Sequence, residues 1–135
     1  MIYLKLFESF GYRPIEFEET DRWETNRSKE IITSREMTLL KKEIEKSGKE
    51  VEFIYTDENT IDLVIKDDQN LSENESGVSA HICKYEDDYF ILSLISVYRS
   101  DASRDWDSHP MDSSSDYMCD EIDGVISALK KILYN

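Results

Sequence analysis

A stripe of apolar side chains close to the C-terminal end of this chain constrains its fold more than any other feature. The stripe follows the roughly 3.6-residue spacing of one helix face and consists of Ile122, Val125, Ile126, Leu129, Ile132 and Leu133. Asp120 occupies the expected N-cap position, with Glu121 and Asp123 at the positive end of the helix dipole. Lys130 and Lys131 lie near the negative end. A helix with one apolar face must cover a second apolar surface, which the other segments have to supply.

A second helix is predicted over residues 34–47. Thr33 and Glu36 match a capping box, in which each side chain satisfies a free backbone N–H at the start of a helix. Gly48 follows at the position of a left-handed C-terminal cap. The inward positions recur at helical spacing and are Met37, Leu40 and Ile44.

Period-two alternation predicts two antiparallel hairpins between the helices. The first consists of two apolar-polar runs within residues 51–66, on either side of a polar turn at 57–59. The second joins residues 78–84 to residues 89–97 through a turn at 85–88, and the continuous apolar run of 89–97 is typical of a central strand buried on both faces. A further strand precedes the C-terminal helix, and the segments 67–77 and 100–116 are expected to be loops.

These elements predict an α+β fold, with a single antiparallel sheet of about four to six strands and two helices packed on one face. Residues 1–135 are expected to form a single domain. The N-terminal run 2–7 fits either a strand or a short helical turn. Phe17 and Trp23 are expected to anchor the following polar stretch onto the core.

The charge of the chain restricts its partners. Lys and Arg number 16 against 30 Asp and Glu, which gives a formal net charge of −14. Such a charge repels phosphate groups, so nucleic acids and anionic membranes are disfavoured as partners and a protein with a basic surface is favoured. No stretch approaches the ~20 apolar residues of a membrane span, and the N-terminal residues do not read as a secretory signal. We therefore expect a cytoplasmic protein in which Cys83 and Cys119 are reduced core residues.

The polar segment 100–116 raises the question of a metal or catalytic site. Its Asp residues and His109 could hold Mg²⁺ or Ca²⁺, but their spacing matches no calcium-binding loop. His81 and Cys83 share one face of a predicted strand, and a zinc site with Cys119 can be imagined, although the spacing fits no structural zinc motif. The sequence contains neither a nucleophile elbow nor a glycine-rich phosphate loop. We therefore expect no catalytic residues, no metal and no cofactor.

Two acid-rich segments are the remaining candidates for function. Residues 57–76 contain seven acids and one Lys, and residues 101–123 contain eight acids and one Arg. If the strand order brings these segments to one end of the sheet, they form a negative rim around Trp106 that could imitate nucleic-acid phosphates and occupy a basic cleft. A lone Trp in a polar loop either folds back onto the core or acts as a binding anchor. The candidate binding residues are Asp101, Asp105, Trp106, Asp107 and Asp112 in one patch, and Asp67, Asp68, Glu73 and Glu75 in a second.

Three stretches of the sequence are similar to a layout found in small uncharacterised proteins from phage genomes. They are IYLKLFESF near the N-terminus, YEDDYFILSLI in the second hairpin and DYMCDEIDGVISALKKIL at the C-terminal end. The last one contains an aromatic-x-Cys-Asp-x-x-x-Gly pattern formed by Tyr117, Cys119, Asp120 and Gly124. The resemblance implies a phage-encoded accessory protein. The chain departs from this layout in its long 98–116 segment, so no functional residue is carried over.

Together these observations predict a non-enzymatic binding protein that occludes a basic surface of a host or viral protein, with inhibition of a host defence as one form of that role. A virion or assembly component is the first alternative, and it would show self-association or a large stable interface. A small metal-dependent hydrolase that uses the Asp and His side chains of 100–116 is the second. A protein that sequesters a nucleotide signal is disfavoured by the charge, unless the few Arg residues converge.

Overall fold

The computed structural model describes residues 11–15, 28–67, 74–100, 105–109, 111 and 113–134. The strands in these ranges are β1 (Tyr12–Pro14), β2 (Val51–Thr56), β3 (Thr60–Lys66), β4 (Asn74–Lys84), β5 (Tyr89–Ser100) and β6 (Ser115–Asp120). The helices are α3 (Ser34–Ser47) and α4 (Glu121–Leu133), and a short 3-10 turn, η1 (Glu86–Asp88), joins β4 to β5. The interpretations of residues 2–7, Phe17 and Trp23 fall outside the described residues.

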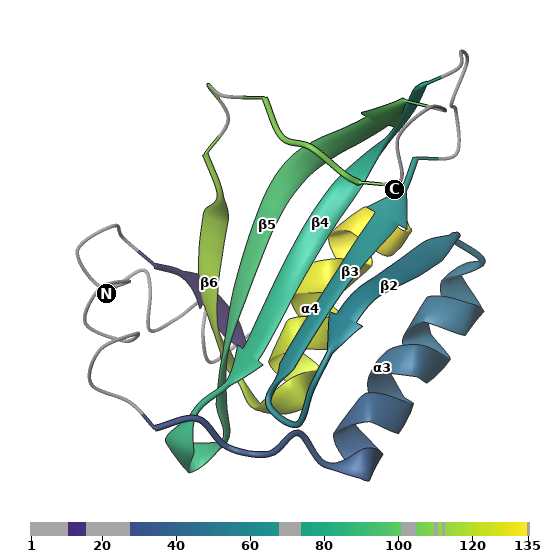
Figure 1. Ribbon diagram of the computed structural model, residues 1–135. Coiled ribbons are helices and arrows are strands. Elements are labelled where there is room, and N and C mark those ends of the chain that lie inside the picture. Colours follow the sequence, from purple (N-terminus) through teal and green to yellow (C-terminus); the bar gives the residue numbers. More distant parts are fainter. Residues whose placement is uncertain are drawn as a thin grey trace.

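The strands form one antiparallel sheet of six strands in the order β1-β6-β5-β4-β3-β2. Figure 1 shows α3 and α4 on the same side of this sheet, α4 behind β3 and β4 and α3 beside the β2 edge. The predicted α+β class is therefore confirmed, together with the range of strands and the pair of helices on one face.

The hydrophobic core lies between the sheet and the helices. Alternate side chains of a strand point to opposite faces, so Ile61 and Leu63 of β3 share the helix-facing side with Phe90 and Leu92 of β5, and all four are fully buried. The predicted stripe of α4 covers them. Its buried members are Ile122, Val125, Leu129 and Leu133, and its partly buried members are Ile126 and Ile132.

Helix α3 begins and ends where the sequence predicts. Glu36 N donates to Thr33 Oγ1 at 3.2 Å and Thr33 N donates to Glu36 Oε1 at 2.9 Å, so both halves of the capping box form. Gly48 adopts the left-handed conformation, with φ 74°. Leu40 and Ile44 are buried against the core, as their spacing indicates.

A buried ion pair connects the end of β4 to the start of α3. Lys84 Nζ lies 2.8 Å from Glu36 Oε1, and the two side chains are only 4% and 10% exposed. Burial by itself lowers the pKa of Lys84, but the bonds to Glu36 and to Asp88 outweigh it, so the pKa lies above the usual lysine value. The Glu36 carboxylate thus both caps α3 and neutralises a lysine inside the fold.

The strand β1 is not predicted by the sequence, and it depends on two glycines. Tyr12 of β1 pairs with Cys119 of β6, and the backbone N–H of Asp120 donates to Gly11 O at 2.6 Å. Gly124 of α4 packs against the same carbonyl, because a Cβ at position 124 would lie 1.9 Å from Gly11 O. Only a residue without a side chain fits there.

The prediction that Asp120 caps α4 is correct in position and wrong in mechanism. Asp120 is the N-cap residue, but its side chain makes no capping hydrogen bond. Strand β6 turns directly into α4, with Glu121 at a positive φ of 56°. This abrupt reversal leaves the Asp120 side chain exposed instead of over the first N–H groups of the helix.

The second hairpin is longer than its sequence pattern indicates. Strand β4 begins at Asn74 instead of residue 78, so the last residues of the predicted 67–77 loop pair with β5, which continues to Ser100. Gly77 allows this extension, because a Cβ there would lie 2.5 Å from Ile65 O of β3. The acidic segment between β3 and β4 is shorter as a result.

A bulge interrupts the alternation predicted for β2. Phe53 pairs with Leu63 and Tyr55 pairs with Asp62, which leaves Ile54 as the extra residue. Phe53, Ile54 and Tyr55 are 39%, 51% and 53% exposed. Three consecutive large apolar side chains are therefore exposed to solvent on the edge strand β2.

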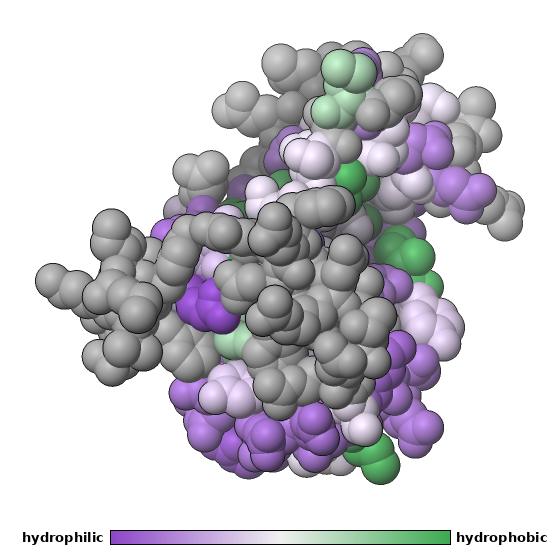
Figure 2. All heavy atoms as spheres, turned by 90° about the vertical axis from the view of Figure 1, so that its left-hand side faces the viewer, coloured by the Kyte–Doolittle hydropathy of each residue, from purple (hydrophilic) through white to green (hydrophobic). Residues whose placement is uncertain are grey.

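The described surface that is visible from the side of β1 is largely hydrophilic. Figure 2, seen from the side of β1, shows polar side chains gathered over the lower part of the described surface and apolar ones only in small separate groups. Among the described residues, no helix is long and apolar enough to cross a membrane.

Candidate functional site: the open face of the sheet

The face of the sheet opposite the helices, here called the open face, combines apolar and ionisable side chains. Near one end, Cys83 of β4, Ile91 of β5 and Met118 of β6 form a small buried cluster. In the middle, His81 Nδ1 and Asp62 Oδ1 are hydrogen-bonded across β4 and β3, and these side chains are 51% and 30% exposed. A polar pair thus lies accessible on an otherwise packed strand surface.

Part of each acid-rich segment, the loop after β3 and the loop after β5, starts at the same end of the sheet. Lys66 pairs with Gly77 and Asn74 pairs with Ser100, so the end of β3, the start of β4 and the end of β5 are adjacent. The backbone of Tyr98 then pairs with Asp107, which brings the chain after β5 back along that strand. In Figure 1 the stretch from residue 105 crosses the upper part of the sheet on the side away from the helices.

Trp106 folds back onto the open face. Its Nε1 donates to Glu52 Oε2 at 3.4 Å, and the Arg99 guanidinium lies 4.4 Å from the centre of its ring. Arg99 is itself held by two carboxylates, since its Nη1 lies 3.1 Å from Glu52 Oε2 and its Nε donates to Glu75 Oε2 at 3.1 Å. Lys66 Nζ approaches the same carboxylates at 3.8 and 4.0 Å. We refer to Glu52, Lys66, Glu75, Arg99 and Trp106 as the Arg99 cluster.

A groove of about 450 Å³ opens beside the Trp106 ring. Its lining residues come from four strands and the 105–109 stretch, and they are Ile54, Asp62, Val64, Ser79, Val97, Asp105 and Trp106. Most of the wall is apolar, and the two Asp side chains bring carboxylates to it. We refer to this feature as the Trp106 groove.

The candidate binding residues occupy different environments. Asp105 and Asp107 are exposed on either side of the half-buried Trp106, and Asp67 is exposed at the end of β3. Glu75 is half-buried within the Arg99 cluster. The other four candidates, Asp101, Asp112, Asp68 and Glu73, lie outside the described residues.

The sequence does not predict the polar pair of Asp62 and His81 or the Trp106 groove, because both depend on the register between paired strands. The sequence shows only that Asp62 lies in the first predicted hairpin and His81 in the second. Acidic side chains also occur at the opposite end of the sheet, where Asp57, Glu58 and Asp87 are exposed. Negative charge alone therefore does not distinguish the two ends, whereas the groove does.

The imagined zinc site does not form. Cys83 belongs to the buried cluster of the open face, whereas Cys119 lies in the core between sheet and helices, so the two thiols are on opposite faces. Both cysteines are free and buried, which confirms their predicted burial. Burial raises the pKa of the Cys119 thiol well above its usual value, so this thiol stays protonated.

His109 is exposed and its Nδ1 accepts a hydrogen bond from Met111 N at 3.2 Å. Among the residues that the structure describes, no three His, Cys, Asp or Glu side chains come together as a metal site would require. The His109 imidazole therefore takes part in a local hydrogen bond within this segment.

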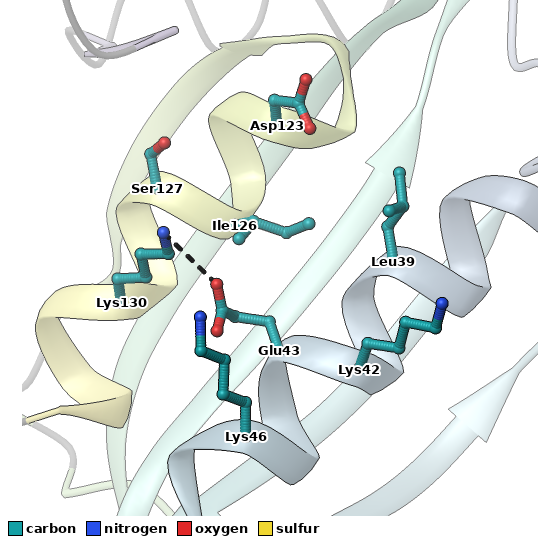
Figure 3. A pocket seen from close by; sticks show the side chains of 8 residues that line it. All are labelled: Leu39, Lys42, Glu43, Lys46, Asp123, Ile126, Ser127 and Lys130. Carbon is teal, nitrogen blue, oxygen red and sulfur yellow. Dashed lines mark ion pairs between the residues drawn. The ribbon is translucent and has the colours of Figure 1, made fainter.

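A second groove, of about 400 Å³, runs between α3 and α4. Figure 3 shows Leu39 and Ile126 within it and charged side chains around them. Lys130 Nζ lies 3.3 Å from Glu43 Oε1, and a hydrogen bond from Tyr134 lowers the pKa of Glu43. Because lysines and carboxylates alternate along this groove, its charge selects no particular ligand.

Acidification is expected to loosen the hold of the Arg99 cluster on the Trp106 ring, because Glu75 anchors the guanidinium that lies over that ring. The hydrogen bond from Arg99 lowers the pKa of Glu75 below its usual value of 4.5 in the folded protein. The carboxylate therefore stabilises the fold above that usual pKa, and this contribution is lost as the pH falls through the lower folded pKa. The measurement is tryptophan emission as a function of pH. It uses a Trp23→Phe variant, because the chain has two tryptophans and this substitution leaves only Trp106.

A Glu75→Gln variant provides the control for this titration. It should show the acid-like emission spectrum already at neutral pH and a flatter pH profile, because the ionised partner of Arg99 is missing. Emission that stays constant until circular dichroism reports global unfolding would contradict the expectation.

Comparison with protein-family models, curated proteins and solved structures finds no match to this chain.

Proposed function

We propose that this chain is a non-enzymatic, acidic protein-binding module that occludes a basic surface of another protein. The resemblance to phage-encoded proteins suggests a host or viral protein as the partner and an inhibitory outcome, with counter-defence as one form of that role. The observation that carries the proposal is that the loops after β3 and β5, one from each acid-rich segment, start at the same end of the sheet, and that the stretch 105–109 returns from there over the open face, where Trp106 lines the groove.

Electrostatics support a protein partner with a basic surface. The net charge of −14 repels anionic ligands and speeds encounter with a cationic surface. The half-buried Trp106 supplies a rigid aromatic surface next to exposed carboxylates, and binding sites are commonly centred on such aromatic side chains. Charge gives attraction over distance, and the groove gives a place for specific contact.

Charge reversal at the groove end is expected to weaken partner binding. The variant Asp67→Lys/Asp107→Lys changes one exposed residue from each acid-rich segment and leaves the groove lining intact. Retention of a basic partner in a tagged pull-down from host lysate should fall about tenfold at low salt, equivalent to about 1.4 kcal/mol. The salt dependence of the remaining binding should be flatter, because fewer ion pairs form.

The matched control is Glu45→Lys/Glu58→Lys, which makes the same change in net charge at exposed positions on α3 and at the opposite end of the sheet. It should bind like the unchanged chain. Equal loss in both variants would show that only overall charge matters, and unchanged binding in both would contradict the assigned surface.

An assembly component remains the second candidate, and the exposed apolar residues of edge strand β2 favour it. A pull-down without a partner at low and moderate salt, together with a mass above that of the monomer by light scattering, would replace the binding proposal with this one. A salt-sensitive basic partner and a monomeric mass would exclude it.

A further inference from the structure

We infer that the Trp106 groove receives a long cationic side chain, lysine or arginine, from the partner protein. This inference rests on the proposed function and specifies the contact at its centre. It commits to a ligand with an aliphatic stem and a positive end group, which is the chemistry that the groove walls and their charges match.

The walls of the groove suit an aliphatic stem. Ile54 of β2, Val64 of β3 and Val97 of β5 line it together with Trp106, and Ile54 is 51% exposed at its rim. Lysine and arginine bury their methylene groups along apolar surfaces while the charged end stays in polar surroundings. A volume of about 450 Å³ accommodates one such side chain with its water.

The charges of the groove select a cation. Asp62 and Asp105 both line it, one from β3 and the other from the stretch next to Trp106. The hydrogen bond with His81 orients the Asp62 carboxylate. These carboxylates would repel an anion and gain nothing from a purely apolar ligand, whereas an ammonium or guanidinium group would pair with them.

The Trp106 ring is preorganised as the aromatic wall. The Arg99 guanidinium lies over the ring, and Glu52 accepts from the indole N–H, so the ring orientation is set before a ligand arrives. Arg99 is not part of the groove lining, and its charge is engaged by Glu52 and Glu75. The groove therefore offers an indole, the side chain that binds cations best among aromatic residues, without presenting a repelling charge.

The test uses nuclear magnetic resonance of the full ¹⁵N-labelled chain with four small probes. N-acetyl-arginine amide and N-acetyl-lysine amide carry the cation, and N-acetyl-citrulline amide and N-acetyl-norleucine amide are their neutral counterparts. The cationic probes should shift the Trp106 indole signal and the amides of Ile54, Val64 and Val97. The neutral probes should bind at least about fivefold more weakly, because they lack the pairing with the carboxylates.

Two variants assign the effect to the groove. Asp62→Asn/Asp105→Asn should weaken the cationic probes at least about fivefold and leave the neutral ones unchanged, because it removes charge and keeps shape. Glu45→Gln/Glu58→Gln removes the same charge elsewhere and should change nothing. Circular dichroism of both variants checks that they are folded.

Equal binding of charged and neutral probes, or shifts confined to other surfaces, would overturn the inference. So would the absence of shifts with any probe. These results leave the proposed function standing if a basic partner is still captured in a salt-sensitive manner and lost with Asp67→Lys/Asp107→Lys. Failure of that capture, with the probe results intact, would instead overturn the proposed function.

Discussion

Replacement of Lys84 by methionine is expected to destabilise the fold by about 3 kcal/mol, at the lower end of the range for breaking a buried ion pair. The substitution leaves the Glu36 carboxylate in the interior without the ammonium group that lies 2.8 Å away. Glu36 still accepts the hydrogen bond from Thr33 N, so the loss is not at the upper end of that range. Urea unfolding followed by circular dichroism measures the change in free energy.

The control for this prediction is Lys130→Met, the same change in an ion pair whose lysine is open to solvent. Lys130 is 52% exposed where it meets Glu43, so its removal should cost at most about 1 kcal/mol. Glu36→Gln made in the Lys84→Met background should cost less than the same change in the unchanged chain, because the two side chains interact. Equal losses for Lys84→Met and Lys130→Met would contradict the role of the buried pair.

Replacement of Gly124 by alanine is expected to destabilise the fold by about 2–3 kcal/mol, although alanine is the better helix former. The new Cβ would lie 1.9 Å from Gly11 O and 3.2 Å from the Cβ of Cys119, so α4 or β1 must move. Helix propensity alone predicts a gain of about 1 kcal/mol, so the two effects differ in sign. Urea unfolding decides between them.

Ser127→Ala on the same helix is the matched control, and it should change stability by no more than about 0.5 kcal/mol. A Gly124→Ala variant that is as stable as the unchanged chain would show that β1 can shift without loss. Amide hydrogen exchange at Tyr12 would then report whether β1 still pairs with β6.

Several features could be predicted from local sequence because neighbouring residues decide them. The capping box of Thr33 and Glu36 and the left-handed Gly48 depend on a few consecutive positions, and α3 begins and ends accordingly. The apolar stripe from Ile122 to Leu133 faces the core for the same reason. Alternation in β3 likewise predicts that Ile61, Leu63 and Ile65 face the helices together.

Other features depend on segments that the sequence does not show to be neighbours. The short strand β1 forms because Gly11 and Gly124 permit a close approach between two distant parts of the chain. The bulge at Ile54 and the start of β4 at Asn74 depend on the register of the adjacent strands. The capping role expected of Asp120 failed because the turn from β6 into α4 directs its side chain elsewhere.

The candidate site also combines features that the sequence shows with features that need the tertiary structure. Composition and spacing were sufficient to identify two acid-rich segments and Trp106 as candidates for binding, because charge and a lone aromatic residue can be recognised in the sequence itself. The loops after β3 and β5 start at one end of the sheet because of the strand order, and long-range pairing decides that order. The sequence by itself determined the α+β class, the two helices and the strong negative charge. Only the tertiary structure decided the Arg99 cluster and the Trp106 groove, because the residues that form them come from strands far apart in the chain and meet only when the sheet assembles.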